Sequence, residues 1–214
     1  MIDATHFELI KRKHGSYGSW AVWASQGQTP KSNMGDIEVL DPRANPSLLQ
    51  TLNPGVVMVG LNLSRGFPDS PFRNFHDPDP VANDFKIRHA FSGTSYWGAY
   101  MTDVIKRHVE LDSAQLLNHL RANPQVIKDH VEALRSEVLD LGHPKPVILA
   151  FGRAAYSLLE RNLSCNDYSL LVRITHYSHY ISMENYRLAV HQQIASSLRD
   201  TAQQAYPSEN FEVD

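Results

Sequence analysis

The chain has 214 residues, of which 42% are hydrophobic and 20% charged, and its formal net charge is −3 at neutral pH. This composition is typical of a globular protein with one domain, or two at most, and it excludes a collagen-like, coiled-coil or wholly disordered chain. Because the overall charge is not basic, binding to nucleic acid would need a locally basic surface. The single cysteine excludes an internal disulfide, a four-cysteine iron–sulfur cluster and a cysteine-rich zinc site.

The sequence gives no sign of membrane insertion or export. No apolar run approaches the roughly 20 residues of a membrane-spanning helix. The first residues do not follow the basic, apolar and small-residue order of a signal peptide. We therefore expect a cytoplasmic protein that has no membrane partner and is a monomer.

The first half of the chain is irregular. Residues 1–54 are interrupted by glycine and proline, and we expect them to wrap an edge of the core as part of the same domain. A short β-branched run at residues 56–59 predicts a buried strand that ends at Gly60. Residues 60–95 form a second irregular region, rich in proline. A connection of this length in a compact domain is usually functional.

Strands and helices alternate in the second half. The predicted strands are residues 99–104, 146–151 and 170–174, and the predicted helices are residues 113–121, 124–142, 154–162 and 183–201. The acidic tail, residues 206–214, is expected to fray. The alternation predicts a three-layer α/β/α domain over residues 55–205, with helices on both faces of a mainly parallel sheet.

Polar residues with useful chemistry follow the predicted strands. In open parallel sheets, ligands bind beyond the carboxyl ends of the strands. Those ends carry Asn62, Asp103 and His176. Asn62 could orient a water molecule, Asp103 could accept protons or hydrogen bonds, and His176 could donate a hydrogen bond to a developing anion.

Four segments, in this order along the chain, resemble motifs of the uracil-DNA glycosylase superfamily. Gly-Leu-Asn-Leu-Ser at residues 60–64 is similar to the asparagine form of its first motif, with leucine in place of proline. His-Tyr-Ser at residues 176–178 is similar to its His-Pro-Ser motif, with tyrosine in place of proline. Residues 101–106 and 148–155 resemble its second and third strands. The resemblance covers about residues 55–200 and is nearest to the mismatch-specific branch. It implies a central sheet of four strands in the order 2-1-3-4.

The resemblance also implies an activity. A glycosylase of this type flips a damaged or deaminated base out of DNA and hydrolyses its N-glycosidic bond, the first step of base excision repair. Asn62 would align the attacking water, and His176 would stabilise the anion on the departing base. The partner would be single-stranded or mismatched DNA, and neither a cofactor nor a metal is implied.

Base recognition would involve a departure from the family pattern, because Asp103 stands where the family reads uracil with an asparagine. An ionised carboxylate only accepts hydrogen bonds, so it would suit an exocyclic amino group and would repel uracil O4. For the ring that stacks on the base, the resemblance offers Phe91, which we favour, or Phe72, whose segment also supplies Asn74 for base recognition. The implied DNA contacts are Ser64, Arg65, Gly152, Arg153, Ser178, His179 and Tyr180.

Two other hypotheses remain open. The protein could keep this fold and sense a flipped base without chemistry, since two motif prolines are missing and Asp103 replaces an amide. It could also be an unrelated α/β enzyme acting on a nucleotide or small molecule, with His176 and Asp103 as an acid–base pair. The sequence has no Walker loop, no glycine-rich dinucleotide motif and no serine elbow, which argues against this last hypothesis.

Overall fold

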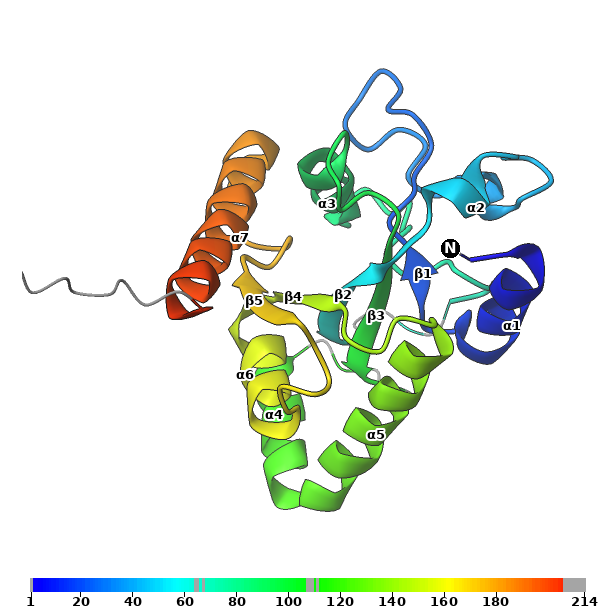
Figure 1. Cartoon of the computed structure of the whole chain (residues 1–214). Helices are drawn as coiled ribbons and strands as arrows, with labels where there is room; N and C mark the ends of the chain where they lie inside the picture. The colour runs from blue at the N-terminus through cyan, green and yellow to red at the C-terminus, as the bar shows by residue number, and fades with distance from the viewer. Residues whose placement is uncertain (1, 64–65, 67, 107–109, 111, 206–214) are drawn as a thin grey trace, which may run out of the picture.

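The computed structural model describes residues 2–205 except 64–65, 67, 107–109 and 111, so the predicted tail at residues 206–214 lies outside the described residues. The predicted α/β class with a mainly parallel sheet is confirmed (Figure 1). The parallel strands are β2 (Asn53–Asn62), β3 (Ala99–Ile105), β4 (Val147–Phe151) and β5 (Leu170–Ile174). The whole sheet has the order β1-β3-β2-β4-β5.

The expected number of four strands is wrong, because a short fifth strand, β1 (Ser19–Trp20), pairs antiparallel with β3 at the edge of the sheet. Trp20 of this strand is fully buried, and its ring meets that of Tyr100 edge-on at 5.0 Å between centroids. Two residues are too few to produce an alternating pattern in the sequence. Burial of the tryptophan, a tertiary effect, therefore fixes this strand.

Helices cover both faces of the sheet (Figure 1). One face carries α4 (Ser113–Ala122), α5 (Pro124–Asp140) and α6 (Gly152–Asn162), and the other carries α3 (Asp84–Phe91) and α7 (Met183–Ala205). A hydrophobic cluster lies on each face of the sheet, and successive residues of a strand pack into alternate clusters. Val57 packs with the α4–α6 side and Met58 with the α3–α7 side. This explains why the strands read as continuous apolar runs, since both of their faces are buried.

The four helices predicted in the second half of the chain are confirmed to within a few residues. Sequence patterns missed α1 (Ala4–His14), the 3₁₀ turn η1 (Glu38–Leu40), the single-turn α2 (Leu48–Thr51), and α3. The start of α1 is fixed by Asp3, whose side chain accepts a hydrogen bond from the His6 backbone N–H at 2.8 Å. No helix in the described part of the chain is long and apolar enough to cross a membrane.

The N-terminal segment holds the long loop that follows β2. The hydroxyl of Ser19 donates to the Phe72 carbonyl at 2.6 Å, and the Trp23 indole donates to the Phe75 carbonyl at 3.1 Å. Phe72 and Phe75 both have a φ of 64°, a left-handed conformation that bulky residues rarely adopt. These hydrogen bonds help to offset the cost of that conformation.

Candidate functional site

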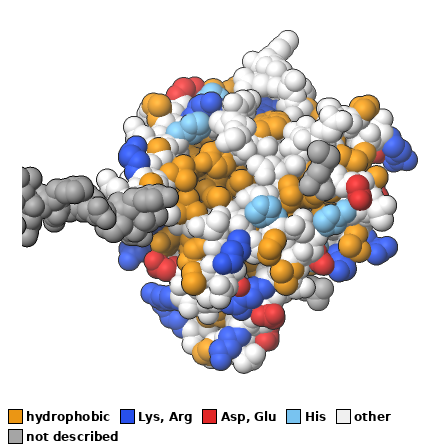
Figure 2. Space-filling view, in the orientation of Figure 1, with side chains coloured by type: hydrophobic (Ala, Val, Ile, Leu, Met, Phe, Trp, Pro, Cys, Tyr) orange, Lys and Arg blue, Asp and Glu red, His pale blue; other side chains and the backbone are white. Residues whose placement is uncertain are grey.

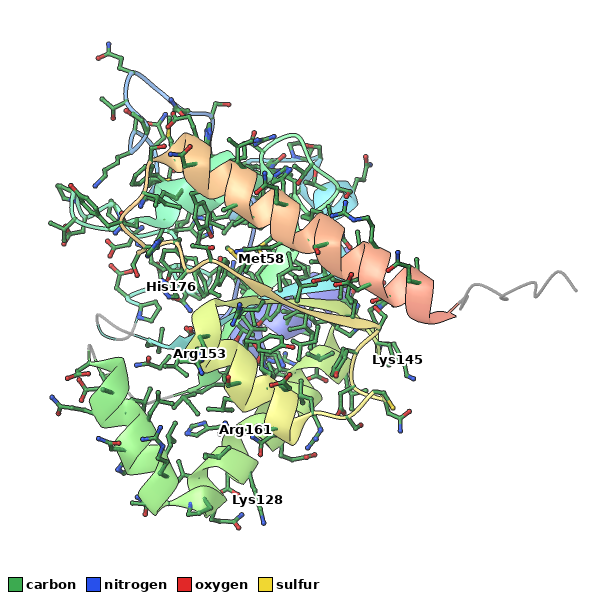
Figure 3. All side chains as sticks on the ribbon, turned by 90° about the vertical axis from the view of Figure 1, so that its left-hand side faces the viewer. Met58, Lys128, Lys145, Arg153, Arg161 and His176 are labelled. Carbon is green, nitrogen blue, oxygen red and sulfur yellow. The ribbon has the colours of Figure 1, made fainter. Side chains whose placement is uncertain are left out.

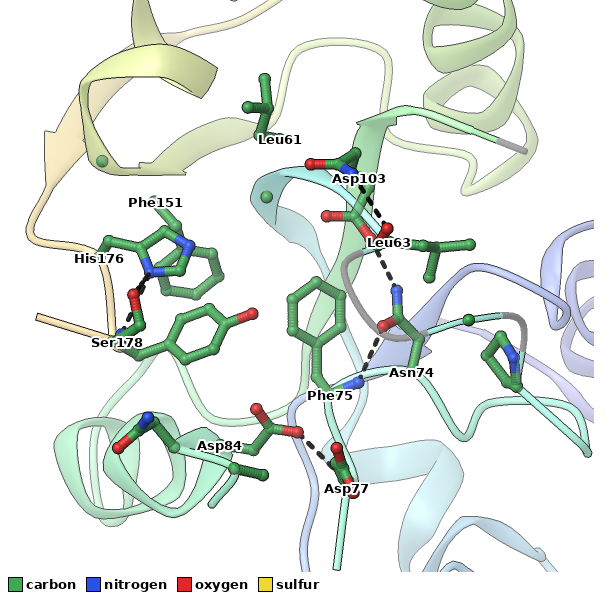
Figure 4. Close-up of a pocket in the computed structure, with 18 of the residues that line it drawn as sticks. Leu61, Leu63, Asn74, Phe75, Asp77, Asp84, Asp103, Phe151, His176 and Ser178 are labelled. Carbon is green, nitrogen blue, oxygen red and sulfur yellow. Dashed lines mark hydrogen bonds between the residues drawn. The ribbon is translucent and has the colours of Figure 1, made fainter. Parts of the chain in front are cut away.

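A pocket of about 740 Å³ opens at the carboxyl ends of the parallel strands (Figure 4). Its lining includes Asn62 at the end of β2, Asp103 on β3, Phe151 at the end of β4 and His176 beyond β5. This volume lies within the range of small-molecule sites in proteins. The structure therefore brings together three side chains that the sequence identified at separate strand ends.

Asp103 is buried in this pocket and held by Asn74. The Asn74 amide nitrogen donates to Asp103 Oδ2 at 2.9 Å and to the Tyr17 carbonyl at 2.7 Å. Both amide hydrogens are thus used within the protein. Asn74, which we expected to read a base, lines the pocket but acts on Asp103 instead.

The other oxygen of Asp103, Oδ1, lies directly against Gly60. A Cβ added to Gly60 would come within 2.2 Å of it, so no larger residue fits at position 60 without moving the carboxylate. Burial raises the pKa of Asp103 from 3.8 to about 6, while the Asn74 hydrogen bond and the charge of Lys106 act in the opposite direction. Asp103 therefore changes charge slightly below neutral pH.

A buried ionic network lies behind Asp103. The Lys106 ammonium donates to the Asp103 carbonyl at 2.8 Å and to Thr102 Oγ1 at 2.9 Å, and it forms an ion pair with Glu137. The Tyr100 hydroxyl donates to Glu137 Oε1 at 2.5 Å. The lysine therefore acts on the Asp103 carboxylate through space, while its hydrogen bonds go to other groups.

His176 presents a defined tautomer to the pocket. Its Nδ1 lies 3.1 Å from the Ser178 backbone nitrogen and 2.8 Å from Ser178 Oγ. A backbone N–H can only donate, so Nδ1 is the acceptor and the ring proton sits on Nε2. Burial lowers the pKa of His176 from 6.5 to about 4, and the ring is neutral at neutral pH. In Figure 4 the ring lies across the pocket from Asp103, with its second nitrogen directed inward.

The backbone around His176 also depends on a glycine. Gly152 begins α6 with a φ of 82°, in the left-handed region, and a Cβ there would lie 3.2 Å from the Cβ of His176. A glycine at this position allows the turn after β4 to approach the histidine closely. Gly152 and the neighbouring Arg153 both line the pocket, as predicted from their position at a strand end.

Asn62 is fixed at the end of β2 by its amide nitrogen. This nitrogen donates to the Leu63 carbonyl at 3.0 Å and to the Glu110 carbonyl at 2.8 Å. Because both amide hydrogens point to backbone oxygens, any action of Asn62 on a ligand must come from its side-chain oxygen, which only accepts. The side chain is partly exposed in the pocket wall.

Neither of the two phenylalanines expected to stack on the base, Phe91 and Phe72, lines the pocket. Phe91 is fully buried in the core between the sheet and α7, because it lies on the inward face of α3. Phe72 is 1% exposed and packs on the Phe7 ring at 5.4 Å. Phe75 lines the pocket instead, although it is only 4% exposed, and its ring lies 6.2 Å from that of Phe151 and 6.3 Å from that of Tyr177. The sequence analysis did not select Phe75, although this residue directly follows Asn74 in the chain.

The predicted DNA contacts divide into three groups. Ser178 lines the pocket, as do Gly152 and Arg153. His179 and Tyr180 are exposed in the same loop outside the pocket lining, and the His179 carbonyl accepts a hydrogen bond from Lys86 at 2.8 Å. Ser64 and Arg65 lie outside the described residues.

The site was also compared with known proteins. No protein-family model, curated protein or solved structure matches the chain.

Proposed function

We propose that this protein is a DNA glycosylase related to the uracil-DNA glycosylase superfamily, which takes a flipped base into the pocket and hydrolyses its N-glycosidic bond. The observation that carries this proposal is the meeting of Asn62, Asp103 and His176 in one pocket. The order of the parallel strands, β3-β2-β4-β5, supports it as well. Numbered without the edge strand β1, this is the 2-1-3-4 order that the sequence resemblance implies.

The neutral His176 suits the departing base. As the bond between the sugar C1′ and the base nitrogen breaks, its electron pair leaves with the base, which becomes an anion. The Nε2–H of a neutral imidazole can donate a hydrogen bond to that anion without losing its proton. Ser178, which donates to Nδ1 from its backbone nitrogen at 3.1 Å, holds the ring in the required tautomer.

Asn62 would contribute by position rather than by basicity. An amide oxygen is a poor proton acceptor, but it can accept a hydrogen bond from a water and hold that water toward C1′. The water oxygen forms the new bond to C1′, and its proton passes to solvent or to the departing base. The bonds from the Asn62 amide nitrogen to two carbonyl groups fix the direction of the side-chain oxygen.

Recognition of the base would combine Phe75 with Asp103. The Phe75 ring offers a stacking face that tolerates different bases. Asp103 Oδ1 accepts a hydrogen bond from a base that carries an N–H group on its Watson–Crick edge. With a pKa of about 6, the carboxylate is mostly ionised at neutral pH and disfavours uracil O4 nearby. We therefore infer a base with an exocyclic amino group as the preferred substrate.

The test is an excision assay on oligonucleotides that carry uracil, hypoxanthine or other altered bases. We expect Asn62→Ala to abolish product formation and to leave DNA binding mostly intact. The matched control is Asn185→Ala on the exposed surface of α7, which should change neither. His176→Ala should slow bond cleavage by roughly 10²–10³-fold, as expected for loss of one donor to an anion.

Two results would overturn the proposed function. Unchanged turnover in both Asn62→Ala and His176→Ala would show that the proposed roles of these two residues in catalysis are wrong. Binding of modified DNA without release of any base by the wild-type protein would leave the base-sensing hypothesis in its place.

A further inference from the structure

A second concave surface lies beside the base pocket, between α4, α5 and α6. This groove has a volume of about 380 Å³. Its floor is apolar and consists of Leu117 and Leu120 from α4, Ile127 from α5 and Leu158 from α6. Its polar lining includes Arg121, Arg153 and Arg161, and we call it the arginine groove.

The arginine groove is distinctly basic within a chain of net charge −3. All three arginine side chains are exposed, and no Asp or Glu is among the described residues that line the groove. Within the described part of the chain, none of the three forms an ion pair with a carboxylate. Figure 2 shows several Lys and Arg side chains on the lower part of the molecule, where α4 and α6 lie, with a few Asp and Glu side chains among them. This surface is suited to an anionic ligand.

The groove borders the base pocket. Arg153 and Ala154, at the beginning of α6, line both cavities. In Figure 3, Arg153 lies between His176 of the base pocket and Arg161 farther along α6. A ligand that leaves the base pocket along α6 therefore passes all three arginines.

The base pocket also has several carboxylates in its lining, together with Arg73, which lies 3.7 Å from Asp69. Asp69, Asp77 and Asp84 are among its lining residues, and Asp84 Oδ2 accepts a hydrogen bond from the Asp77 backbone N–H at 3.0 Å (Figure 4). Phosphate groups are repelled by such carboxylates and attracted by arginines. Because the described lining of the arginine groove has no carboxylate, the side of the pocket toward α6 is the more favourable one for a polyanion.

We propose that the arginine groove binds the sugar–phosphate backbone of a single-stranded DNA segment that continues from the nucleotide in the base pocket. This inference rests on the proposed function for the identity of the polyanion. Arg153 and Arg161 are eight residues apart on α6, or about 12 Å along the helix axis, which spans more than one nucleotide. The apolar floor can contact sugars and base faces between the phosphates.

The dimensions favour a single strand over a duplex. The groove has a volume of only about 380 Å³, which can hold part of one strand and is too small to enclose a double helix. A protein that holds the flanking nucleotides in this way would prefer a base in single-stranded or locally opened DNA. An acidic amphipathic peptide has a similar pattern of charge and apolar groups, and the experiment separates it from DNA.

The experiment measures the affinity of the protein for a short fluorescein-labelled single-stranded oligonucleotide as the NaCl concentration is varied. For single strands, the slope of log K against log salt concentration is about −0.7 for each phosphate neutralised. We expect Arg121→Gln and Arg161→Gln each to reduce the magnitude of this slope by about 0.7, and the double variant by about 1.4. Arg199→Gln, which removes the same charge from the exposed surface of α7, is the matched control and should leave the slope unchanged.

The outcomes separate this inference from the proposed function. If the double variant has the same salt slope as wild type, the arginine groove does not bind DNA, whether or not the protein excises a base. An equal loss of affinity for a duplex of the same sequence would overturn the single-strand assignment. If the double variant loses affinity for an acidic amphipathic peptide and not for the oligonucleotide, the groove is a protein-docking site. If the double variant has a reduced slope but the wild-type protein excises no base, the groove binds DNA and the proposed glycosylase activity is wrong.

Discussion

The Asn74 amide nitrogen donates a hydrogen bond to Asp103 Oδ2 across 2.9 Å, and its second hydrogen goes to the Tyr17 carbonyl. Asn74 and Asp103 were each expected to contact the base, but the hydrogen bond makes Asn74 a support for Asp103. The amide is used to hold the acid, and the acid presents its other oxygen, packed against Gly60, at the pocket wall. Recognition at this position therefore depends on the charge of Asp103.

The first prediction concerns the pH dependence of base choice. The pKa of Asp103 is raised to about 6 by burial, so the carboxylate is mostly ionised above that pH and increasingly neutral below it. We expect uracil release to be weak at neutral pH and to increase as pH falls through about 6, because only the protonated acid can donate to uracil O4. Asp103→Asn should raise uracil release at neutral pH and remove this inflection. The measurement is kcat/KM for excision across the range.

Stability measurements provide the control for this variant. The folded state retains a proton on Asp103 to a higher pH than the unfolded chain does, so this group makes the free energy of unfolding fall as pH rises from about 4 to about 6. Asp103→Asn should lack that fall and remain folded. Strong uracil release by wild type that is independent of pH and unaffected by Asp103→Asn would show that Asp103 does not read the base.

The second prediction concerns acid sensitivity and arises from His176. Burial lowers its pKa to about 4, whereas a histidine in the unfolded chain titrates near 6.5. The unfolded state thus binds a proton first as the solution is acidified, and the folded protein loses stability as pH falls from about 6.5 to about 4. In urea titrations, His176→Gln should show a smaller loss over this range, by about 1–3 kcal/mol.

His76 gives an internal comparison for this effect. It is fully buried, and burial lowers its pKa to about 3. Its contribution has the same sign, so wild-type acid sensitivity should persist in part in His176→Gln. An identical pH dependence of the unfolding free energy in wild type and His176→Gln would contradict the neutral, buried state of His176.

The third prediction compares two buried rings, of which Phe75 lines the pocket and Phe91 does not. Phe75→Leu removes the stacking face and should weaken binding of oligonucleotides with a flipped base by roughly 1–3 kcal/mol. Phe91→Leu makes the same chemical change inside the core, so it should lower the free energy of unfolding and leave the affinity of the folded protein unchanged. Fluorescence anisotropy and urea unfolding report the two quantities. Loss of affinity in Phe91→Leu, with none in Phe75→Leu, would reassign the platform.

The elements that the sequence predicted are those with a period or a composition of their own. Strands such as β4 are continuous apolar runs, and α5 has apolar residues at helical spacing, so local patterns were sufficient to identify them. The missed elements depend on tertiary contacts. β1 has two residues and is fixed by burial of Trp20, and α3 lies in a region where prolines and polar residues conceal its inward face.

The site also has one part that the sequence predicts and another that depends on tertiary contacts. Asn62, Asp103 and His176 could be placed together because strand ends meet at one edge of a parallel sheet. The choice among phenylalanines could not be made from the sequence, since it depends on two left-handed residues in the loop after β2. That loop takes its conformation from hydrogen bonds to Ser19 and Trp23, more than fifty residues away in the chain.

The last prediction concerns the buried ion pair behind Asp103. Glu137 is fully buried and Lys106 is 4% exposed, and the glutamate also accepts the Tyr100 hydroxyl. Glu137→Leu leaves the ammonium of Lys106 without its counter-charge, which should lower the free energy of unfolding by about 3–5 kcal/mol. The double variant Glu137→Leu with Lys106→Met removes both charges and should recover part of that loss, because the desolvation of an unpaired charge is the main cost. Urea unfolding of the two single variants and the double variant gives the coupling energy between the partners. The control is Asp41→Asn, which breaks an ion pair with Arg43 on the surface. It should change the free energy of unfolding very little. Additive effects of the two buried substitutions on the free energy of unfolding would mean that the ion pair contributes no coupling energy.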